Sequence, residues 1–289
     1  AHQLVIKYSS AWSFLVPEIL QLDEATIQSF IDSNDNLKRY EFDLKLINEK
    51  RPHILDANTE KLLTEAQDAL STPSNVYGMF SNADLEFEDA IDKDGQAYPL
   101  TQGTFIKYLE SDDRELRASA FRNVYKAYGA HNNTLGATLA GEVKKNVFNA
   151  RTHHYRSARE RALSNNHIPE AVYDNLIKTV HKYLPLLHRY TKLRQELLGL
   201  DDLKMYDLYT PLVKDVKFEM PYEEAKSWML KALEPMGEEY LNVVKEGLDN
   251  RWVDVYENKG KRSGGYSSGG HLTNPFILLN WSDTVSDLY

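Results

Sequence analysis

Cysteine is absent from this sequence of 289 residues, and that absence excludes several kinds of chemistry. A chain without thiols forms no disulfide bonds, has no thiolate nucleophile and cannot build a cysteine-rich zinc site. Any zinc site would have to rely on the nine histidines and on carboxylates. The lack of cysteine also fits a reducing compartment, and we therefore expect a cytoplasmic protein.

Long apolar runs and an excess of positive charge are missing as well. Phe276 to Leu279 is typical of the longest apolar runs, whereas a membrane-spanning helix needs about 20 apolar residues. The formal net charge is −9, whereas nucleic-acid binding requires a basic surface. We therefore expect neither a membrane nor a nucleic acid among the partners. The N-terminal sequence AHQLVIKYSS shows no signal-peptide pattern.

Apolar residues recur at helical spacing over most of the chain, which predicts a mainly α-helical fold. Hydrophobic residues make up 42% of the chain and charged residues 27%, as in globular domains. Gly129, Gly136 and Gly141 are possible breaks in the longest helical stretch, and Pro185 predicts a kink or a break in another. The expected helices are 23–31, 36–51, 56–70, 111–154, 169–198, one that begins at Pro221, and 237–248.

One stretch, NADLEFEDAIDKDGQAYPLT, has a different pattern. Asp92-Lys93-Asp94-Gly95 separates two short segments, and Asp-Gly in that position favours a β-hairpin. We expect a mainly α protein with one small β-hairpin and a late edge strand. The expected division is a helical lobe with the hairpin at 1–110 and a second helical part at 111–289.

The histidines do not form a recognisable metal site. His181 and His188 lie seven residues apart on one expected helix, about 10 Å along its axis, which is too far for one ion. His153 and His154 are adjacent, so on a helix they point about 100° apart. The motif His-Glu-x-x-His does not occur. We interpret these histidines as surface or capping residues and assign no metal ligand to this chain.

Other catalytic patterns are also incomplete. Ser267 and Ser268 lie in GGYSSGG, which does not match Gly-x-Ser-x-Gly, and the run has no Gly-Lys-Ser/Thr ending for phosphate binding. Pairs of acidic residues occur at or near expected helix starts, where they complement the helix dipole. These pairs are Asp201–Asp202, Glu223–Glu224 and Glu238–Glu239. No complete catalytic set is present, and we assign no catalytic residue to this chain.

The glycine-rich run SGGYSSGG suits the edge of a sheet, where another backbone can approach closely. A peptide can add to such an edge through main-chain hydrogen bonds, so that its side chains are read loosely. The alternative is a flexible surface loop, which the composition of the run favours. Tyr266 and the apolar run Phe-Ile-Leu-Leu that follows support an ordered strand instead.

The last residues begin a helix. Ser282 or Asp283 is the expected N-cap, and Val285, Leu288 and Tyr289 follow at helical spacing. A helix of this length is not stable alone, so we expect a further segment to continue it.

Several stretches resemble oligoendopeptidase F, one of the thimet-oligopeptidase-like zinc metallopeptidases. ENKGKRSGGYSSGG and TNPFILLNW (273–281) resemble the segment just before the active-site helix of that family. Other similar stretches follow in the order of the family and span the whole chain. They are SFLVPEIL (13–20), NADLEF (82–87), AVYDNLI (171–177), MYDLYTPLV (205–213) and GEEYL (237–241).

The resemblance implies that this chain is an internal part of a longer peptidase, ending just before a His-Glu-x-x-His helix. It implies a deep channel for oligopeptides between two helical lobes, and a zinc ion whose ligands lie outside this chain. In that family the zinc polarises the scissile carbonyl and lowers the pKa of its bound water. The implied partners are the oligopeptide substrate and the missing N- and C-terminal parts of the parent chain.

The resemblance also implies which residues of this chain bind substrate. Gly264, Gly265, Tyr266 and Ser267 match the strand that lines the channel. His271 is a further candidate, although an aromatic residue and a glycine are more usual there than His-Leu. We expect the chain alone to bind no catalytic zinc and to hydrolyse nothing. The alternative is a non-catalytic helical peptide-binding or scaffold protein.

Overall fold

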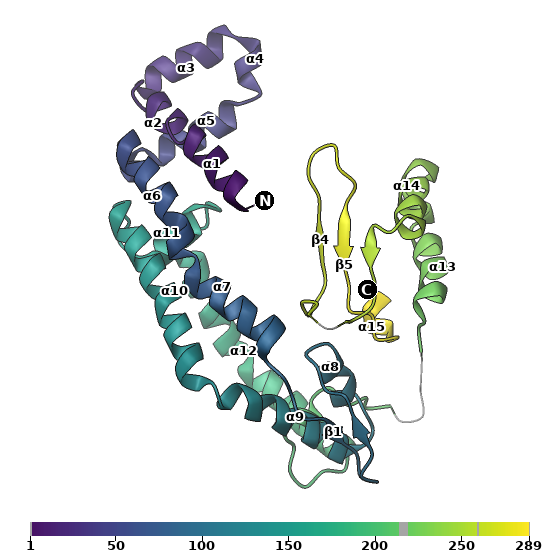
Figure 1. Ribbon diagram of the computed structural model, residues 1–289. Helices are drawn as coiled ribbons and strands as arrows, with labels where there is room; N and C mark the ends of the chain where they lie inside the picture. Colours follow the sequence, from purple (N-terminus) through teal and green to yellow (C-terminus); the bar gives the residue numbers. More distant parts are fainter. Residues whose placement is uncertain (1, 214–218, 259, 289) are drawn as a thin grey trace. The chain divides into compact units, whose positions relative to one another are not determined.

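The computed structural model describes residues 2–213, 219–258 and 260–288, and their fold is mainly α-helical (Figure 1). The mainly α prediction is therefore confirmed. The α-helices are α1 (His2–Trp12), α2 (Leu15–Ile19), α3 (Glu24–Ser33), α4 (Asp35–Lys38), α5 (Glu41–Glu49), α6 (Ala57–Leu70), α7 (Thr72–Met79), α8 (Thr104–Leu109), α9 (Arg114–Gly129), α10 (Asn132–Thr152), α11 (Ala158–Ser164), α12 (Glu170–Leu197), α13 (Tyr222–Ala232), α14 (Glu238–Asp249) and α15 (Val285–Leu288).

Shorter turns and strands connect these helices. The 3₁₀ turns are η1 (Arg51–His53), η3 (Met205–Asp207) and η4 (Glu234–Met236), and η2 (Phe80–Asp84) is a π-helical turn. The strands are β1 (Ala90–Ile91), β2 (Ala97–Tyr98), β3 (Val253–Asp254), β4 (Tyr266–Ser268) and β5 (Phe276–Leu278).

Two expected helix boundaries need correction. The sequence suggests Ser111 as the cap of this helix, but the N-cap of α9 is Asp113, whose side chain accepts from the N–H groups of Glu115 and Leu116. The hydroxyl of Ser111 accepts from the N–H of Asp113 instead. The long stretch to His154 is two helices, which separate after Gly129. Helix α12 continues through Pro185, so the break that the sequence allows at this proline does not occur.

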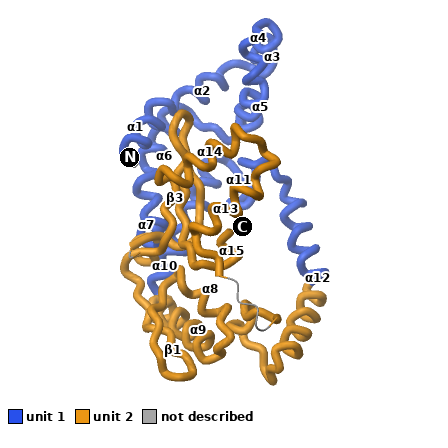
Figure 2. Tube along the Cα trace, turned by 90° about the vertical axis from the view of Figure 1, so that its right-hand side faces the viewer, with its two compact units in different colours: residues 1–77, 133–183 blue, residues 78–132, 184–289 orange. Residues whose placement is uncertain are grey.

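The chain forms two compact units, and both are discontinuous in sequence (Figure 2). Unit 1 contains residues 1–77 and 133–183, and unit 2 contains residues 78–132 and 184–289. The division suggested by the sequence, 1–110 and 111–289, is contiguous and differs from these units. The hairpin belongs to unit 2, because the N–H of Ile91 donates to Ser119 Oγ on α9.

Unit 1 is an assembly of helices with close contacts between α7 and α10. A Cβ atom on Gly141 would lie 2.7 Å from the ring of Pro73, so glycine at this position allows the two helices to approach. The ring of His53 stacks on Tyr155 at 3.6 Å between centroids. Its Nδ1 lies 2.9 Å from the carbonyl oxygen of His153. Gly141 therefore serves packing rather than interrupting its helix.

The hairpin of unit 2 has the turn that its sequence predicts. Ala90 pairs with Tyr98 and Ile91 with Ala97 in an antiparallel ladder. Gly95 has a φ of 82°, which other residues adopt only with strain. Ala90 is buried against α9 in a core with four further residues. These are Leu100, Leu116, Ala120 and Val124.

The second sheet of unit 2 has the order β3–β5–β4, with β5 in the centre (Figure 1). Strands β3 and β5 are parallel, and β4 and β5 are antiparallel. Trp281 follows β5 and packs edge-on against Tyr222, with ring centroids 5.3 Å apart. Its Nε1–H donates to the carbonyl of Met220 at 2.9 Å, which ties the sheet to α13.

Candidate functional site

The predicted strand in the glycine-rich run exists, and it lies at an edge of its sheet. Strand β4 pairs with β5 on one side only, within the part of the chain that the structure describes. Tyr266 and Ser267 belong to this strand, and both are exposed. Gly264 and Gly265 lead directly into it. The structure therefore brings four of the five candidate residues together on one exposed segment.

The central strand shows which way the backbone groups of this segment point. The N–H groups of Ile277 and Leu279 donate to the carbonyls of Trp252 and Asp254, at 2.7 and 2.8 Å. These two N–H groups therefore face β3. Because backbone groups alternate in direction along a strand, those of Leu278 face β4.

The pairing register carries this alternation into β4. Tyr266 lies opposite Leu278 and forms the hydrogen-bonded pair, whereas Ser267 lies opposite Ile277. The N–H and C=O of Ser267 consequently point away from β5, toward the open edge. Gly265 is two residues earlier and presents its backbone groups in the same direction. The open edge thus offers backbone donors and acceptors to an approaching strand.

The two glycines have different geometric roles. Gly264 has a φ of 85°, so the chain turns there with a left-handed residue. At Gly265 an added Cβ would lie 3.4 Å from the carbonyl oxygen of Leu278, which is an ordinary contact. Gly264 therefore makes the bend that leads into the strand, and Gly265 begins the straight segment.

Polar side chains that sequence reasoning missed hold the loop before β4. Lys261 is almost fully buried, and its ammonium group donates to the carbonyls of Asp254 and Tyr256, at 3.1 and 2.6 Å. The hydroxyl of Ser263 donates to Gln102 Oε1 at 2.9 Å. In the sequence, a lysine within ENKGKRSGG is typical of a solvated loop, so no local signal marks it as an anchor.

Two cavities of unit 2 meet at this loop, and Gln102 and Gly103 line both of them. One, of about 490 Å³, lies between the π-helical turn and residues 257–258 and 260–263. The other, of about 360 Å³, lies between α8, Gly264–Gly265 and the residues around α15. The segment that leads into the edge strand therefore lines both cavities, with Ser263 in the first and Gly264 and Gly265 in the second.

The second cavity is lined by two carboxylates, those of Glu110 and Asp287. Burial and then the charge of Asp287 raise the pKa of Glu110 above its usual value. Asp287 Oδ2 accepts four hydrogen bonds, from the N–H and hydroxyl groups of Ser282 and Thr284, at 2.9 to 3.0 Å.

The same contacts correct the expected N-cap of the final helix. Thr284 directly precedes α15, which begins at Val285, so neither Ser282 nor Asp283 is the capping residue. The expected helix start is otherwise present. Tyr289, which the sequence also assigns to it, lies outside the described residues.

His271 is separated from the other candidates. It lies in the loop between β4 and β5, in a turn where Thr273 Oγ1 bonds to the backbone of Gly270. Leu272 next to it is 92% exposed. The loop follows the strand, whereas Gly264 and Gly265 precede it. A role for His271 in substrate binding stays a prediction.

The side chains do not assemble a zinc site in the described ranges. Within residues 2–213, 219–258 and 260–288, no three His, Asp or Glu side chains come close enough to hold a metal ion. His153 Nε2 lies 3.6 Å from Glu60 Oε2, and its Nδ1 lies 2.8 Å from the carbonyl of Asn149. The residues present therefore do not fit a catalytic zinc, and we derive no catalytic step from them.

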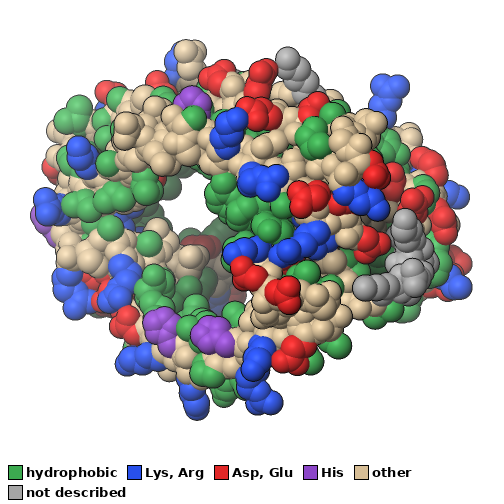
Figure 3. All heavy atoms as spheres, turned by 90° about the horizontal axis from the view of Figure 1, so that it is seen from below, with side chains coloured by type: hydrophobic (Ala, Val, Ile, Leu, Met, Phe, Trp, Pro, Cys, Tyr) green, Lys and Arg blue, Asp and Glu red, His purple; other side chains and the backbone are tan. Residues whose placement is uncertain are grey.

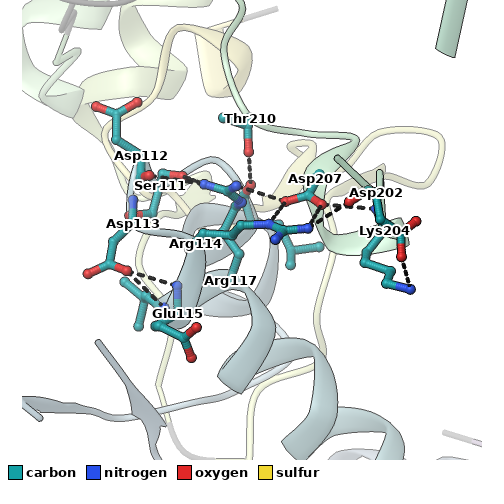
Figure 4. Close-up of polar contacts among 12 residues, drawn as sticks. Ser111, Asp112, Asp113, Arg114, Glu115, Arg117, Asp202, Lys204, Asp207 and Thr210 are labelled. Atoms are coloured by element: carbon teal, nitrogen blue, oxygen red, sulfur yellow. Dashed lines mark hydrogen bonds and ion pairs between the residues drawn. The ribbon is translucent and has the colours of Figure 1, made fainter. Parts of the chain in front are cut away.

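In a second polar cluster of unit 2, the polar groups bond to one another instead of pointing to an open sheet edge, and we call such a cluster closed (Figure 4). Asp207 is fully buried, and its carboxylate accepts from Arg117 at 2.8 Å and from Arg114 at 3.0 and 3.2 Å. Arg194 donates to the backbone carbonyls of Asp207 and Thr210. These contacts join α9, α12 and η3, and we call the five residues the Asp207 cluster.

The described helices contain none that is both long and apolar enough to cross a membrane. On the face shown in Figure 3, acidic and basic side chains are interspersed.

Known proteins resemble this chain over its full length. Residues 107–288 match Peptidase family M3, and residues 18–87 match the family described as Oligopeptidase F. Oligopeptidase PepF of Bacillus subtilis is 53% identical over the whole chain, which covers 43% of that protein. Group B oligopeptidase PepB of Streptococcus agalactiae is 45% identical, again over the whole chain and over 48% of its own length.

A solved structure agrees with these matches. The crystal structure of oligoendopeptidase-F from Enterococcus faecium superposes with a TM-score of 0.70 at 41% identity. The match covers 84% of this chain and 46% of that one. The chain belongs to peptidase family M3, within its oligopeptidase F group. It spans about half the length of the curated relatives it matches.

Proposed function

We propose that this chain is the part of a zinc-dependent oligoendopeptidase that forms walls of the substrate cleft and binds the substrate backbone along β4. Membership of the peptidase family supports the hydrolytic function of the whole protein. The zinc ligands and the hydrolytic groups are assigned to other segments of the parent protein, because the described residues supply no set that fits. The cytoplasmic location stays a prediction.

One observation carries the assignment of β4. Among the described residues, Gly265 and Ser267 present backbone groups without a strand partner at an exposed edge, and Gly265 also lines one of the two cavities. A peptide that adds as a further strand gains main-chain hydrogen bonds irrespective of its sequence, while alternate side chains enter pockets. A peptidase that acts on varied oligopeptides requires such recognition, which depends little on the identity of the side chains. The scaffold alternative uses the same edge, but the family matches favour the peptidase.

Proline at Ser267 tests this function. Proline removes an N–H that faces outward and leaves the ladder to β5 intact, so it is tolerated at such an edge position. We expect Ser267→Pro to weaken binding of a fluorescein-labelled peptide of alternating alanine and lysine by about tenfold, since about 1 kcal/mol per lost hydrogen bond is accompanied by a steric clash. Fluorescence anisotropy measures the affinity.

Two controls separate backbone pairing from other effects. Ser267→Ala keeps the backbone donor, and its affinity should equal that of the wild type. The same peptide, N-methylated at every second amide, should lose binding in one of the two methylation registers and keep it in the other. Equal affinity for Ser267→Pro and the wild type, or for both methylated peptides, would contradict binding along β4.

A further inference from the structure

The side chain of Asn280 reaches from the end of β5 to the bend that leads into β4. Its Nδ2 donates to the carbonyl oxygens of Arg262 and Gly264, at 3.0 and 2.7 Å. Both partners are acceptors, so only the amide nitrogen can face them, and the orientation of the amide follows from this. The Oδ1 atom is buried and has no hydrogen-bond partner among the described residues.

These two hydrogen bonds act at the point where the chain changes direction. Gly264 has a φ of 85°, and its carbonyl is the last before the outward-facing groups of Gly265. Two carbonyls held by one amide fix the separation of Arg262 and Gly264. The direction in which Gly265 presents its N–H and C=O therefore depends on Asn280.

The residue between the two carbonyls is held from the opposite side. The hydroxyl of Ser263 donates to Gln102 Oε1 at 2.9 Å. The amide nitrogen of Gln102 donates in turn to the carbonyl of Ser81 and to the hydroxyl of Tyr128, at 2.9 and 3.1 Å. The bend is thus fixed to the sheet by Asn280 and to the helices of unit 2 by Gln102.

We propose that Asn280, assisted by Ser263 and Gln102, is a positioning residue for peptide binding at β4. It touches no substrate and acts by fixing the bend at Gly264, so that Gly265 and Ser267 present their backbone groups in one geometry. The proposal rests on the proposed peptide binding along β4. Its structural half, the fixed bend, is independent of any ligand.

Asn280→Asp is the most direct test because it keeps the shape of the side chain and removes both donors. The carboxylate would face two carbonyl oxygens, so we expect the bend to open. Hydrogen exchange of the amides at 262–268 should accelerate about tenfold or more, and affinity for the labelled peptide should fall by a similar factor, as expected for the loss of two hydrogen bonds. The far-UV spectrum should not change.

The pH profile distinguishes positioning from a general loss of structure. Two facing carbonyls disfavour the charged carboxylate and raise its pKa above the ordinary value of about 3.9. Protonation restores one donor, so the affinity of the Asn280→Asp variant, relative to the wild type, should recover as the pH falls toward about 5. A variant with general structural damage would show no such recovery.

Matched variants complete the experiment. Asn250→Asp makes the same chemical change at an exposed amide that bonds to one helical carbonyl, and it should change neither exchange nor affinity at β4. Ser263→Ala should accelerate exchange at 262–268, and Ser263→Thr, which keeps the hydroxyl, should restore slow exchange.

The outcomes separate the two proposals. A wild-type chain that binds no peptide overturns the proposed function, and the exchange rates then still decide whether Asn280 fixes the bend. Exchange and affinity that stay unchanged in Asn280→Asp overturn the role of Asn280, whatever the wild type binds. If Asn280→Asp exchanges faster at 262–268 but binds the labelled peptide as tightly as the wild type, Asn280 is not a positioning residue for peptide binding.

Discussion

The Asp207 cluster and the segment before β4 are both rich in polar groups. The cluster is closed, because its groups bond to one another, whereas the segment is open, because some of its backbone groups point to the free edge of the sheet. In the cluster, the carboxylate of Asp207 accepts hydrogen bonds from Arg114 and Arg117 (Figure 4). The backbone carbonyls of Asp207 and Thr210 accept from Arg194. In the segment, side chains hold a bend, while the backbone groups of Gly265 and Ser267 have no strand partner in the described part of the chain. The difference teaches that polar groups directed inward fix the fold of unit 2, and those directed outward are available for recognition.

The electrostatics of the cluster follow from this closure. Burial alone would raise the pKa of Asp207, but the hydrogen bonds from Arg114 and Arg117 outweigh it and hold the pKa below its usual value. The side chain of Asp207 also accepts from the N–H of Lys204 at 2.9 Å. Removal of this carboxylate would leave the buried guanidinium group of Arg117 without its charged partner.

The largest effect is expected from Asp207→Ala. A buried ion pair that loses one partner costs about 3–5 kcal/mol, because the remaining charge is buried without compensation. We expect the free energy of unfolding, measured in urea, to fall by that amount. Asp202→Ala removes an exposed partner of Lys204 and should cost less than about 1 kcal/mol. Equal losses in the two variants would contradict the distinction between closed and open polar regions.

The pH dependence of stability tests the same cluster. Asp207 has a lowered pKa in the folded state, so its contribution is present above the pKa of the unfolded chain, about 3.9, and is lost as the pH falls through the folded value. We expect the wild type to lose stability below about pH 4 more steeply than Asp207→Asn. Urea unfolding at several pH values measures the two slopes, and parallel slopes would exclude this origin.

The sequence predicts features whose causes are local. Helical periodicity, the Asp-Gly turn and the glycine-rich run identify α6, the β1–β2 hairpin and β4, because neighbouring residues alone determine them. The contacts that position the site are not local. Asn280 bonds to carbonyls 16 and 18 residues away, and Gln102 accepts from a residue 161 positions later.

The missed elements have the same origin. Strand β3 has only two residues, too few to show a periodic pattern in the sequence, and it forms by pairing with β5. Asp207 lies in MYDLYTPLV, which has no repeating pattern, and its partners come from helices far along the chain. Backbone carbonyls accept many of the missed bonds, and a carbonyl leaves no signature in a sequence.

An intermediate effect is expected where the open segment joins the core. Trp281 is buried and donates to the carbonyl of Met220, so Trp281→Phe leaves that carbonyl without its partner. The expected loss is about 1–3 kcal/mol in the free energy of unfolding. Trp228→Phe, at a residue that is 50% exposed, should change stability by less than about 0.5 kcal/mol. A smaller loss for Trp281→Phe than for Trp228→Phe would contradict the anchoring role.

The smallest effects are expected in the open segment itself, where two adjacent glycines form a matched pair. Gly264→Ala places a Cβ on a residue with a φ of 85° and should cost about 1 kcal/mol. Gly265→Ala places it in ordinary contact with Leu278 and should change stability by less than about 0.5 kcal/mol. Thermal unfolding of both variants measures the difference. If Gly265→Ala were the more damaging of the two, the bend would lie at Gly265, and Gly265 and Ser267 would not share the open edge.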